Sequence, residues 1–304
     1  MNIYGFWLVV IGAVFLALFS VESKRQLNLG WSSVPAHFTA LTCIFAAGAL
    51  LIITFGTGGP DIATGWWLPM LVTGILNIGI QFANAKAKAL EDVSLVVPIS
   101  ATTPAALVFA SMVILGEYPS LIGWLGIWVL ALGTYMLNVG AYVERRRAAG
   151  ERGFALYLAP LLMLGKSRGV RFALLSALLA TVSLNFDALA CRLANPAFAS
   201  AIAFMIAGGA NLVLSRYSGE KTHSDGPHTL RSVLLLGVFL ALAAYWSGLA
   251  FRYGIAPYVG ALKRLQIPLT IVLAYALVGE RLRFRERLLG GSLMAVGVVL
   301  IGLS

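Results

Sequence analysis

The sequence predicts an all-α polytopic membrane protein, in which ten transmembrane helices form two inverted five-helix repeats around a central cavity. Three observations lead to this fold class. Of the 304 residues, 60% are hydrophobic and 11% are charged, whereas soluble domains carry roughly 25% charged residues. The apolar residues gather in stretches close to the about 20 residues that a membrane-spanning helix needs. The two halves of the chain also repeat the same landmarks.

Ten apolar stretches are predicted to span the membrane, and short turn-forming segments such as residues 56–60 (GTGGP) separate most of them. The first stretch lacks the basic leader and small-residue cleavage site of a signal peptide, so we expect it to be retained as a span. The predicted spans are residues 4–21, 34–55, 66–85, 94–115, 121–142, 172–189, 197–214, 230–251, 258–278 and 288–303.

One connection differs from the others. Residues 143–171 contain three consecutive arginines, Arg145, Arg146 and Arg147, followed by the apolar run FALYLAPLLMLG, which is too short to span a bilayer. We expect this run to form an interfacial helix or part of a linker. The predicted domains are therefore a first five-helix repeat over residues 1–142, a basic linker over 143–171 and a second repeat over 172–304.

The repeated landmarks lie at matching places in the two halves. Each half has a Gly-Glu step after its fourth predicted span, followed by two glycines seven residues apart. These landmarks are Gly116, Glu117, Gly126 and Gly133 in the first half, and Gly279, Glu280, Gly290 and Gly297 in the second. Small residues let helices approach closely. A unit of five spans must insert its second copy upside down because five is odd, which predicts inverted repeats.

The distribution of basic residues predicts the orientation. Most of the 22 Lys and Arg residues fall in the loops after the first, third, fifth, seventh and ninth predicted spans. Basic loops remain in the cytoplasm. We therefore expect a multi-pass protein of the cell (inner) membrane with both termini on the non-cytoplasmic side.

Two stretches carry a resemblance to a known family. They are PISATTPAALVFASMVILGE and KRLQIPLTIVLAYALVGE, and each ends on a Gly-Glu step. With nearly the whole chain, they resemble the drug/metabolite transporter superfamily in its EamA-like branch. The resemblance implies a basket-shaped carrier of ten helices that moves small organic solutes by alternating access. Typical members have cytoplasmic termini, so the orientation predicted above departs from the family.

An adjacent basic pair, Lys263 and Arg264, lies inside the ninth predicted span. Each such charge costs roughly 2.5–3.5 kcal/mol to insert, so it normally faces protein or a water-filled cavity. Arg offers a fork suited to carboxylate or phosphate, and Lys supplies a point charge. The pair resembles the Lys-Arg step of plastid sugar-phosphate translocators, which implies an anionic substrate. Snorkelling to the interface or ion pairing within the protein is the alternative.

Other polar and aromatic residues are candidates for the lining of a cavity. Asn77, Gln81 and Asn84 fall on one face of the third predicted span, where they either line a cavity or hold helices together. Tyr245 and Trp246 lie in the eighth predicted span. They are predicted to form an aromatic wall for the substrate, with ordinary packing as the alternative.

Two carboxylates end predicted spans at similar places in the two halves, Glu22 after the first span and Asp187 in the sixth. An intramembrane carboxylate can serve as the exchange site of a proton-coupled carrier. The alternative is ion pairing with basic neighbours, which are Lys24 and Arg25 for Glu22 and Arg192 for Asp187. The sequence leaves both possibilities open.

Glu117 and Glu280, in the repeated Gly-Glu step, each precede the next predicted helix. A carboxylate at this place can accept the free N–H groups of the helix N-terminus. We therefore expect both residues to have a structural role.

No pattern of an enzyme is present. Cys43 and Cys191 match no metal or redox spacing, and His37, His223 and His228 are scattered. The chain has no Gly-rich phosphate loop and no nucleophile elbow. We expect no cofactor and no metal.

The predicted function is secondary active transport of a small organic metabolite by alternating access, with a carboxylate- or phosphate-bearing solute favoured. One alternative is an exporter of amino acids or amphipathic drugs coupled to protons. An alternative of another class is a membrane scaffold or lipid-handling protein with an incidental cavity. The expected partners are a small-molecule substrate and membrane lipids, with no nucleic acid, and the chain is expected to be a monomer or homodimer.

The predicted orientation can be checked at the C-terminus. A Ser304→Cys protein should react with a membrane-impermeant maleimide added outside intact cells, because the termini are predicted to be non-cytoplasmic. The degree of labelling is the measurement, and protection of this cysteine from the outside would contradict the orientation.

Overall fold

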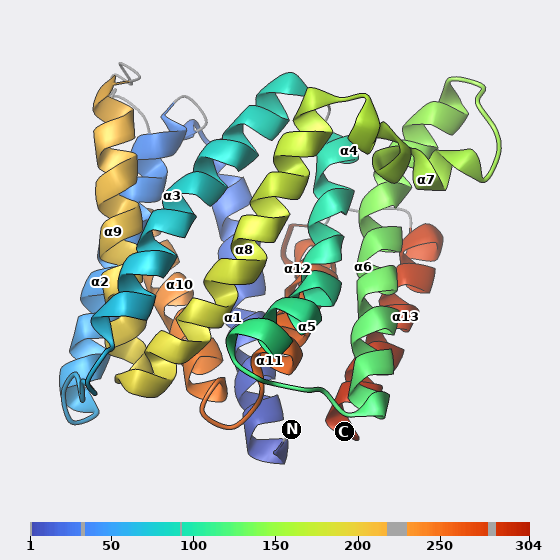
Figure 1. Ribbon diagram of the computed structural model, residues 1–304. Helices are drawn as coiled ribbons and strands as arrows, with labels where there is room; N and C mark the ends of the chain where they lie inside the picture. Colours follow the sequence, from blue (N-terminus) through green and yellow to red (C-terminus); the bar gives the residue numbers. More distant parts are fainter. Residues whose placement is uncertain (1, 32–33, 92, 218–229, 279–283) are drawn as a thin grey trace.

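The computed structural model describes residues 2–31, 34–91, 93–217, 230–278 and 284–304. The regular elements within these ranges are all helices. Figure 1 shows them standing side by side, with both termini at one end of the molecule and the short helix α7 (Ala155–Leu162) at the other. The second Gly-Glu step and two of the histidines, His223 and His228, lie outside the described residues.

The helices follow the order of the predicted spans. The first half contains α1 (Ile3–Asn28), α2 (Pro35–Gly56), α3 (Trp67–Leu90), α4 (Val93–Val96), η2 (Val97–Thr102), α5 (Thr103–Ile114) and α6 (Leu121–Ala148). The helix α7 and the 3-10 turn η3 (Met163–Gly165) form the connection. The second half contains α8 (Arg168–Leu193), α9 (Pro196–Tyr217), α10 (Leu230–Ala250), α11 (Ala256–Leu262), η4 (Lys263–Leu265), α12 (Gln266–Val278) and α13 (Phe284–Gly302).

Among the described residues, eight helical segments are long and apolar enough to cross a membrane. They are α1, α2, α3, the continuous segment Val97–Ile114, α6, α8, α9 and α10. The ninth predicted span is divided into α11, η4 and α12, and the apolar part of α13 covers Gly290–Gly302. Individual helices therefore support eight of the ten predicted spans directly.

The fourth and ninth segments are both broken by a short 3-10 turn, η2 in the first half and η4 in the second. Prolines lie around both breaks, with Pro98 in η2, Pro104 at the start of α5 and Pro268 in α12. A proline removes one backbone donor and clashes with the preceding turn, which favours a break. The freed backbone groups must then be satisfied by other parts of the protein. Every residue of α11 is buried, so the second break lies deep in the bundle.

The repeated glycines bring α6 and α13 together. A Cβ atom added at Gly133 would lie 2.7 Å from the carbonyl oxygen of Gly290, and one added at Gly126 would lie 2.9 Å from that of Gly297. No side chain larger than hydrogen fits at this distance from a backbone atom. The glycines of the two halves therefore face each other across one helix crossing, as small contact residues in membrane helices do.

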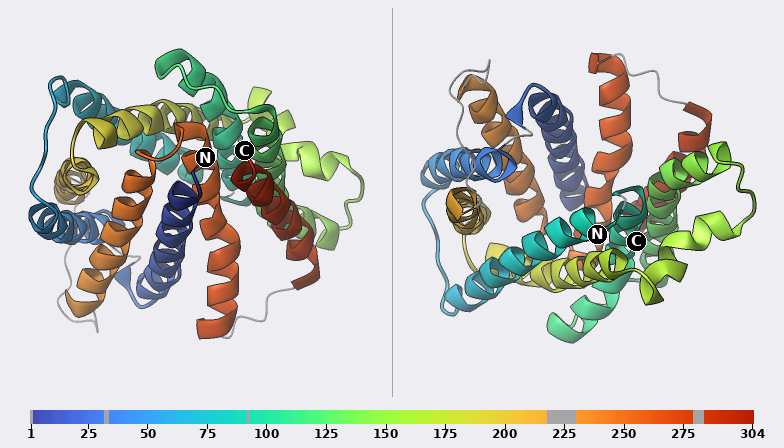
Figure 2. Two further views of the ribbon diagram at one scale, coloured as in Figure 1. Left: turned by 90° about the horizontal axis from the view of Figure 1, so that it is seen from below. Right: turned by 90° about the horizontal axis from the view of Figure 1, so that it is seen from above.

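The packing of the helices is the same when the two halves are exchanged. Helix α1 packs against α10, and its counterpart α8 packs against α3. Helix α2 packs against α9, and α6 against α13, so each of these pairs joins a helix to its own counterpart. In the end views of Figure 2, α1 (blue) lies beside α10 (orange), and α3 (teal) lies beside α8 (yellow-green). Most of the contacts between helices therefore join one half of the chain to the other.

Basic residues gather at the end that carries α7. The last turns of α1, α3 and α6 contain Arg25, Lys88 and Arg145–Arg147, and all three helices finish at the end opposite the termini (Figure 1). Large apolar side chains of and beside α7, such as Phe154 and Leu162, are exposed. The side of the membrane that this end faces stays a prediction.

The glycine contact predicts the effect of one added methyl group. Gly133→Ala should lower stability by about 1–3 kcal/mol, because the new Cβ overlaps the backbone of α13. Gly140→Ala is the matched control on the same helix, since nothing lies within 4 Å of its added Cβ. Alanine is favoured over glycine in a helix by up to about 1 kcal/mol, so the control should be neutral or stabilising. Thermal unfolding in detergent measures both, and equal melting temperatures would contradict the contact.

Candidate functional site

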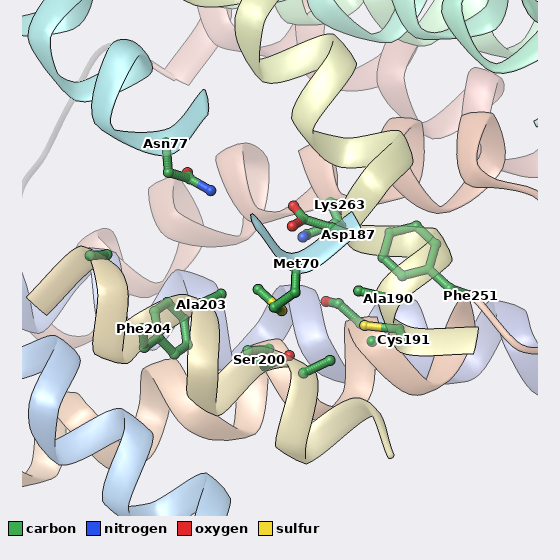
Figure 3. Close-up of a pocket in the computed structure, with 15 residues that line it drawn as sticks. Met70, Asn77, Asp187, Ala190, Cys191, Ser200, Ala203, Phe204, Phe251 and Lys263 are labelled. Carbon is green, nitrogen blue, oxygen red and sulfur yellow. The ribbon is translucent and has the colours of Figure 1, made fainter. Parts of the chain in front are cut away.

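A cavity of about 210 Å³ lies where α3, α8, α9, α10 and η4 meet (Figure 3). Five of its lining side chains can form hydrogen bonds or ion pairs through oxygen or nitrogen: Asn77, Asp187, Ser200, Ser247 and Lys263. The remaining lining residues are apolar or small, namely Met70, Ala190, Cys191, Ala199, Ala203, Phe204, Ala207, Ala244, Gly248 and Phe251. The cavity is therefore a mostly apolar pocket with a few converging polar groups, as ligand sites are.

Asp187 is anchored by a hydrogen-bond network between α3 and α8. Thr73 donates a short hydrogen bond to the Asp187 carboxylate. The Ser183 hydroxyl lies 2.7 Å from Thr73 Oγ1. Ser183 is the donor of this hydrogen bond, because the hydroxyl proton of Thr73 is already donated to Asp187. Asn77 donates to the Thr73 carbonyl oxygen at 2.9 Å. These bonds fix the carboxylate at the edge of the cavity.

Lys263 supplies the opposite charge in the cavity. It begins η4, the turn that interrupts the ninth segment, and Figure 3 shows its ammonium group beside the Asp187 carboxylate. The two charges attract each other. Because Lys263 lies at this break, the break brings a cation to the wall of the cavity. A charge pair in such a low-dielectric place interacts more strongly than one at the surface.

Arg264, the next residue, points elsewhere. Its Nη2 atom donates to the carbonyl oxygen of Ser100 at 3.1 Å, and Ser100 lies in η2, the break of the first half. Adjacent residues of a 3-10 turn project about 120° apart, which explains the different directions of Lys263 and Arg264. Lys263 therefore lines the cavity, whereas Arg264 links the break at η4 to the break at η2.

The polar face of α3 is divided in the same way. Asn77 lines the cavity. Gln81, one turn further along, accepts a hydrogen bond of 2.6 Å from Asn211 of α9. Asn84 is half-buried and is not among the lining residues. The two predicted roles of this face, cavity lining and contact between helices, thus fall to different residues.

Tyr245 and Trp246 do not line the cavity that contains Asp187 and Lys263. Their ring centres lie 5.3 Å apart, and Trp246 packs against the main hydrophobic core. Tyr245 lines a second cavity, of about 310 Å³, together with Asp61, Arg252 and the turn that contains Gly58 and Gly59. The aromatic pair therefore stands between the core and this second cavity.

Glu22 lies at the far end of α1 and is not a lining residue. It accepts a hydrogen bond of 2.6 Å from Gln26 and lies 3.6 Å from Arg25, so it interacts with a basic neighbour as the sequence suggested. The expected pairing of Asp187 with Arg192 is wrong. Arg192 instead lies 2.6 Å from Glu117, because residues five apart on a helix face different directions.

Glu117 has the expected structural role, but at a helix other than the one that follows it. The helix that follows it, α6, is capped by Ser120, whose hydroxyl accepts from the N–H of Gly123 at 3.1 Å. Glu117 instead accepts a 2.7 Å hydrogen bond from the N–H of Ala256, the first residue of α11 in the other half. The carboxylate therefore stabilises a helix N-terminus, but of the broken segment that is distant in sequence.

Several residues of the site are not predicted from the sequence, namely Thr73, Ser183, Ser200 and Ser247. Thr73 precedes Asn77 by four residues and so shares its helix face, which is a signal that could have identified it. The Ser247 hydroxyl is buried and has no hydrogen-bond partner among the described residues. Within the same residues no group of three or more metal-ligating side chains is found, and the two cysteines are separate and buried.

The chain is similar to known proteins in both sequence and fold. The sequence model of the EamA-like transporter family matches residues 3–139 and again residues 167–303. No curated protein matches the sequence. Twenty-five chains of known structure match. One of them, titled "Crystal structure of protein", has a TM-score of 0.74 and 17% identity, covering 97% of this chain and 96% of that one. At this identity the likeness concerns the fold alone.

The network around Asp187 predicts a specific loss of stability. Thr73→Val should destabilise the protein by about 1–3 kcal/mol, because it leaves a buried carboxylate without its hydrogen-bond donor. Thr73→Ser keeps the hydroxyl and should retain most of the stability. Thermal unfolding of the purified protein is the measurement. Thr42→Val is a control, since that buried hydroxyl bonds only the Phe38 carbonyl of its own helix; an equal loss in both Val variants would contradict the network.

Proposed function

Since this chain belongs to the EamA-like transporter family of the drug/metabolite transporter superfamily, we propose that it is a secondary active transporter of a small organic solute. The observation that carries the proposal is the cavity that holds Asp187 and Lys263 between helices of both halves. Binding sites of secondary transporters lie at the interface of repeats, where broken helices leave backbone groups and charges available. The cavity beside η4 has this position.

We also propose the architecture that alternating access requires, ten spans in two inverted five-helix repeats. The repeats would occupy residues 1–142 and 172–304, with a basic linker at 143–171. The symmetric packing of the halves supports it, since α1 on α10 and α8 on α3 are equivalent contacts. The breaks at η2 and η4 support it as well, because they fall at equivalent places. Rocking of the two halves would expose the cavity to each side in turn.

The favoured substrate carries a carboxylate or a phosphate. Lys263 supplies a cation at the wall of a small, largely apolar cavity, where an anionic group can bind directly. Asn77 approaches from α3 and can orient the rest of the solute (Figure 3). Arg264 contributes indirectly, because its bond to Ser100 holds η4 against η2. An anionic solute would compete with Asp187 for Lys263, so Asp187 is the candidate for exchanging a proton when the solute binds.

A second candidate is a zwitterion such as an amino acid. The specific observation in its favour is the presence of both charges, Asp187 and Lys263, in one cavity. The amino group of the solute would then meet Asp187 while its carboxylate meets Lys263. A thermal-shift screen of the purified protein against organic acids, sugar phosphates, amino acids and cationic drugs separates these classes. Stabilisation by phospholipids alone would favour a lipid-handling role instead.

The substrate role of Lys263 predicts a loss of transport. Lys263→Ala in liposomes should weaken binding of an anionic solute by about 2 kcal/mol or more, a roughly thirtyfold loss of affinity, because the solute loses its charge partner in a desolvated place. Arg264→Ala should also reduce uptake, through the lost contact with η2. Initial rates of uptake over a range of concentrations measure both effects.

Lys88→Ala is the matched control for these two variants, since Lys88 is exposed at the end of α3. It should transport as the parent protein does. Melting temperatures show whether each variant is folded. Unchanged transport in both Lys263→Ala and Arg264→Ala would remove the basic pair from the substrate site.

A further inference from the structure

Arg192 and Arg252 join the ends of α8 and α10 by exchanging hydrogen bonds. Each arginine belongs to the end of one helix and donates to carbonyl oxygens at the end of the other. Cations are favoured at helix C-termini, whose last carbonyls lack partners within the helix. The four bonds are Arg192 Nε to Phe251 O (2.8 Å), Arg192 Nη2 to Gly254 O (3.1 Å), Arg252 Nε to Cys191 O (3.2 Å) and Arg252 Nη2 to Ala194 O (2.8 Å).

Glu117 holds this junction from the first half of the chain. It lies in the loop between α5 and α6, and its Oε1 atom is 2.6 Å from Arg192 Nη2. Its Oε2 atom accepts from the N–H of Ala256. One carboxylate thus connects α8 and the start of α11, and only 11% of its side chain is exposed. Charge-assisted bonds of this kind are roughly twice as strong as bonds between neutral groups.

The end of α10 forms a wall between two cavities. Ala244, Ser247, Gly248 and Phe251, spaced as one helix face, line the cavity of Asp187 and Lys263. Tyr245, Leu249 and Arg252, on another face, line the cavity of about 310 Å³. The same short stretch of chain therefore separates the two spaces, and the arginine exchange fixes it in place.

Helices α1 and α3, the counterparts of α8 and α10, end at Asn28 and Leu90. Asn28 and Lys88, near these two ends, are both exposed. The Arg192–Arg252 exchange, which forms a clamp between the two helices, lies where α8 and α10 finish, at the end of the molecule that carries the termini (Figure 1).

From these observations we propose that the Arg192–Arg252 exchange, locked by Glu117, is the closed gate of the transport pathway on the side of the termini. The two cavities are consecutive parts of that pathway, and the end of α10 is the barrier between them. Opening requires α8 and α10 to release each other's carbonyl groups and Glu117 to release Arg192. The inference rests on the proposed function, because a gate presupposes a pathway for a solute.

The chain contains a natural reporter for this gate. Cys191 lines the inner cavity and is buried, and Cys43→Ser leaves it as the only thiol. The purified Cys43→Ser protein is placed in sealed liposomes. Protease removal of a C-terminal tag identifies the vesicles whose termini face outwards. A membrane-impermeant maleimide then measures how fast Cys191 reacts from the side of the termini and from the other side.

Adding Glu117→Gln should raise the labelling rate of Cys191 from the side of the termini by about tenfold, since one charge-assisted bond contributes about that factor to an equilibrium. The amide keeps an acceptor for Ala256 and leaves the surroundings of Cys191 unchanged. Arg192→Lys keeps the charge but loses the fork, and should shift the rate in the same direction. Arg171→Gln is the control, because Arg171 is exposed at the other end of α8.

A rate within about twofold of the parent protein in both gate variants would overturn the proposal. An equal rise from both sides would also overturn it, because general loosening of the fold is not gating. The readout needs no substrate. A protein that transports none of the tested solutes, but shows side-specific labelling that Glu117→Gln changes, would therefore contradict the solute class and support the gate.

Discussion

The structure depends on how two broken helices satisfy their backbone and charged groups inside a bilayer. An unsatisfied polar group in lipid costs several kcal/mol, so a break is tolerated only where the protein supplies partners. The first break receives a guanidinium, from Arg264 to Ser100. The N-terminus of α11, before the second break, receives the Glu117 carboxylate. Each partner comes from the opposite half of the chain, so the breaks hold the halves together at the place where the cavity forms.

The same constraint accounts for the placement of the charges. Within the bundle, the charge of Asp187 is stabilised by the nearby Lys263 and by the hydroxyl of Thr73, and Glu117 forms an ion pair with Arg192. An ion pair in such a place resists separation unless another group of the same sign takes over, because uncompensated charges are strongly disfavoured there. A solute that carries a charge can provide this replacement. In the proposed transport cycle, binding and release at the cavity would depend on the interactions between residues of different helices.

The fold was largely predictable from the sequence because it follows from local patterns. Apolar length identifies spans, and the spacing of Gly126 and Gly133 identifies a contact face that α13 matches. The site was less predictable, since its pairs join residues far apart in the chain. Adjacency suggested that Asp187 pairs with Arg192, yet five residues along a helix turn the two side chains apart. The sequence likewise shows a pair of basic residues, Lys263 and Arg264, inside a predicted span. It does not show the direction of each side chain, because that direction is set by the turn η4.

The two halves of the chain have similar backbones but different side chains. Equivalent places in the two halves can therefore have different roles. The backbone repeats, as the matching helix contacts and the paired breaks show. Lys263 stands where the first half has the uncharged stretch around Ser100. The charges of the cavity and the two arginines of the clamp come from the second half, whereas Glu117, which pairs with Arg192, comes from the first half. A clamp that joins α8 to α10 stabilises one end of the scaffold, and a difference in stability between the two ends would give a carrier a preferred resting conformation.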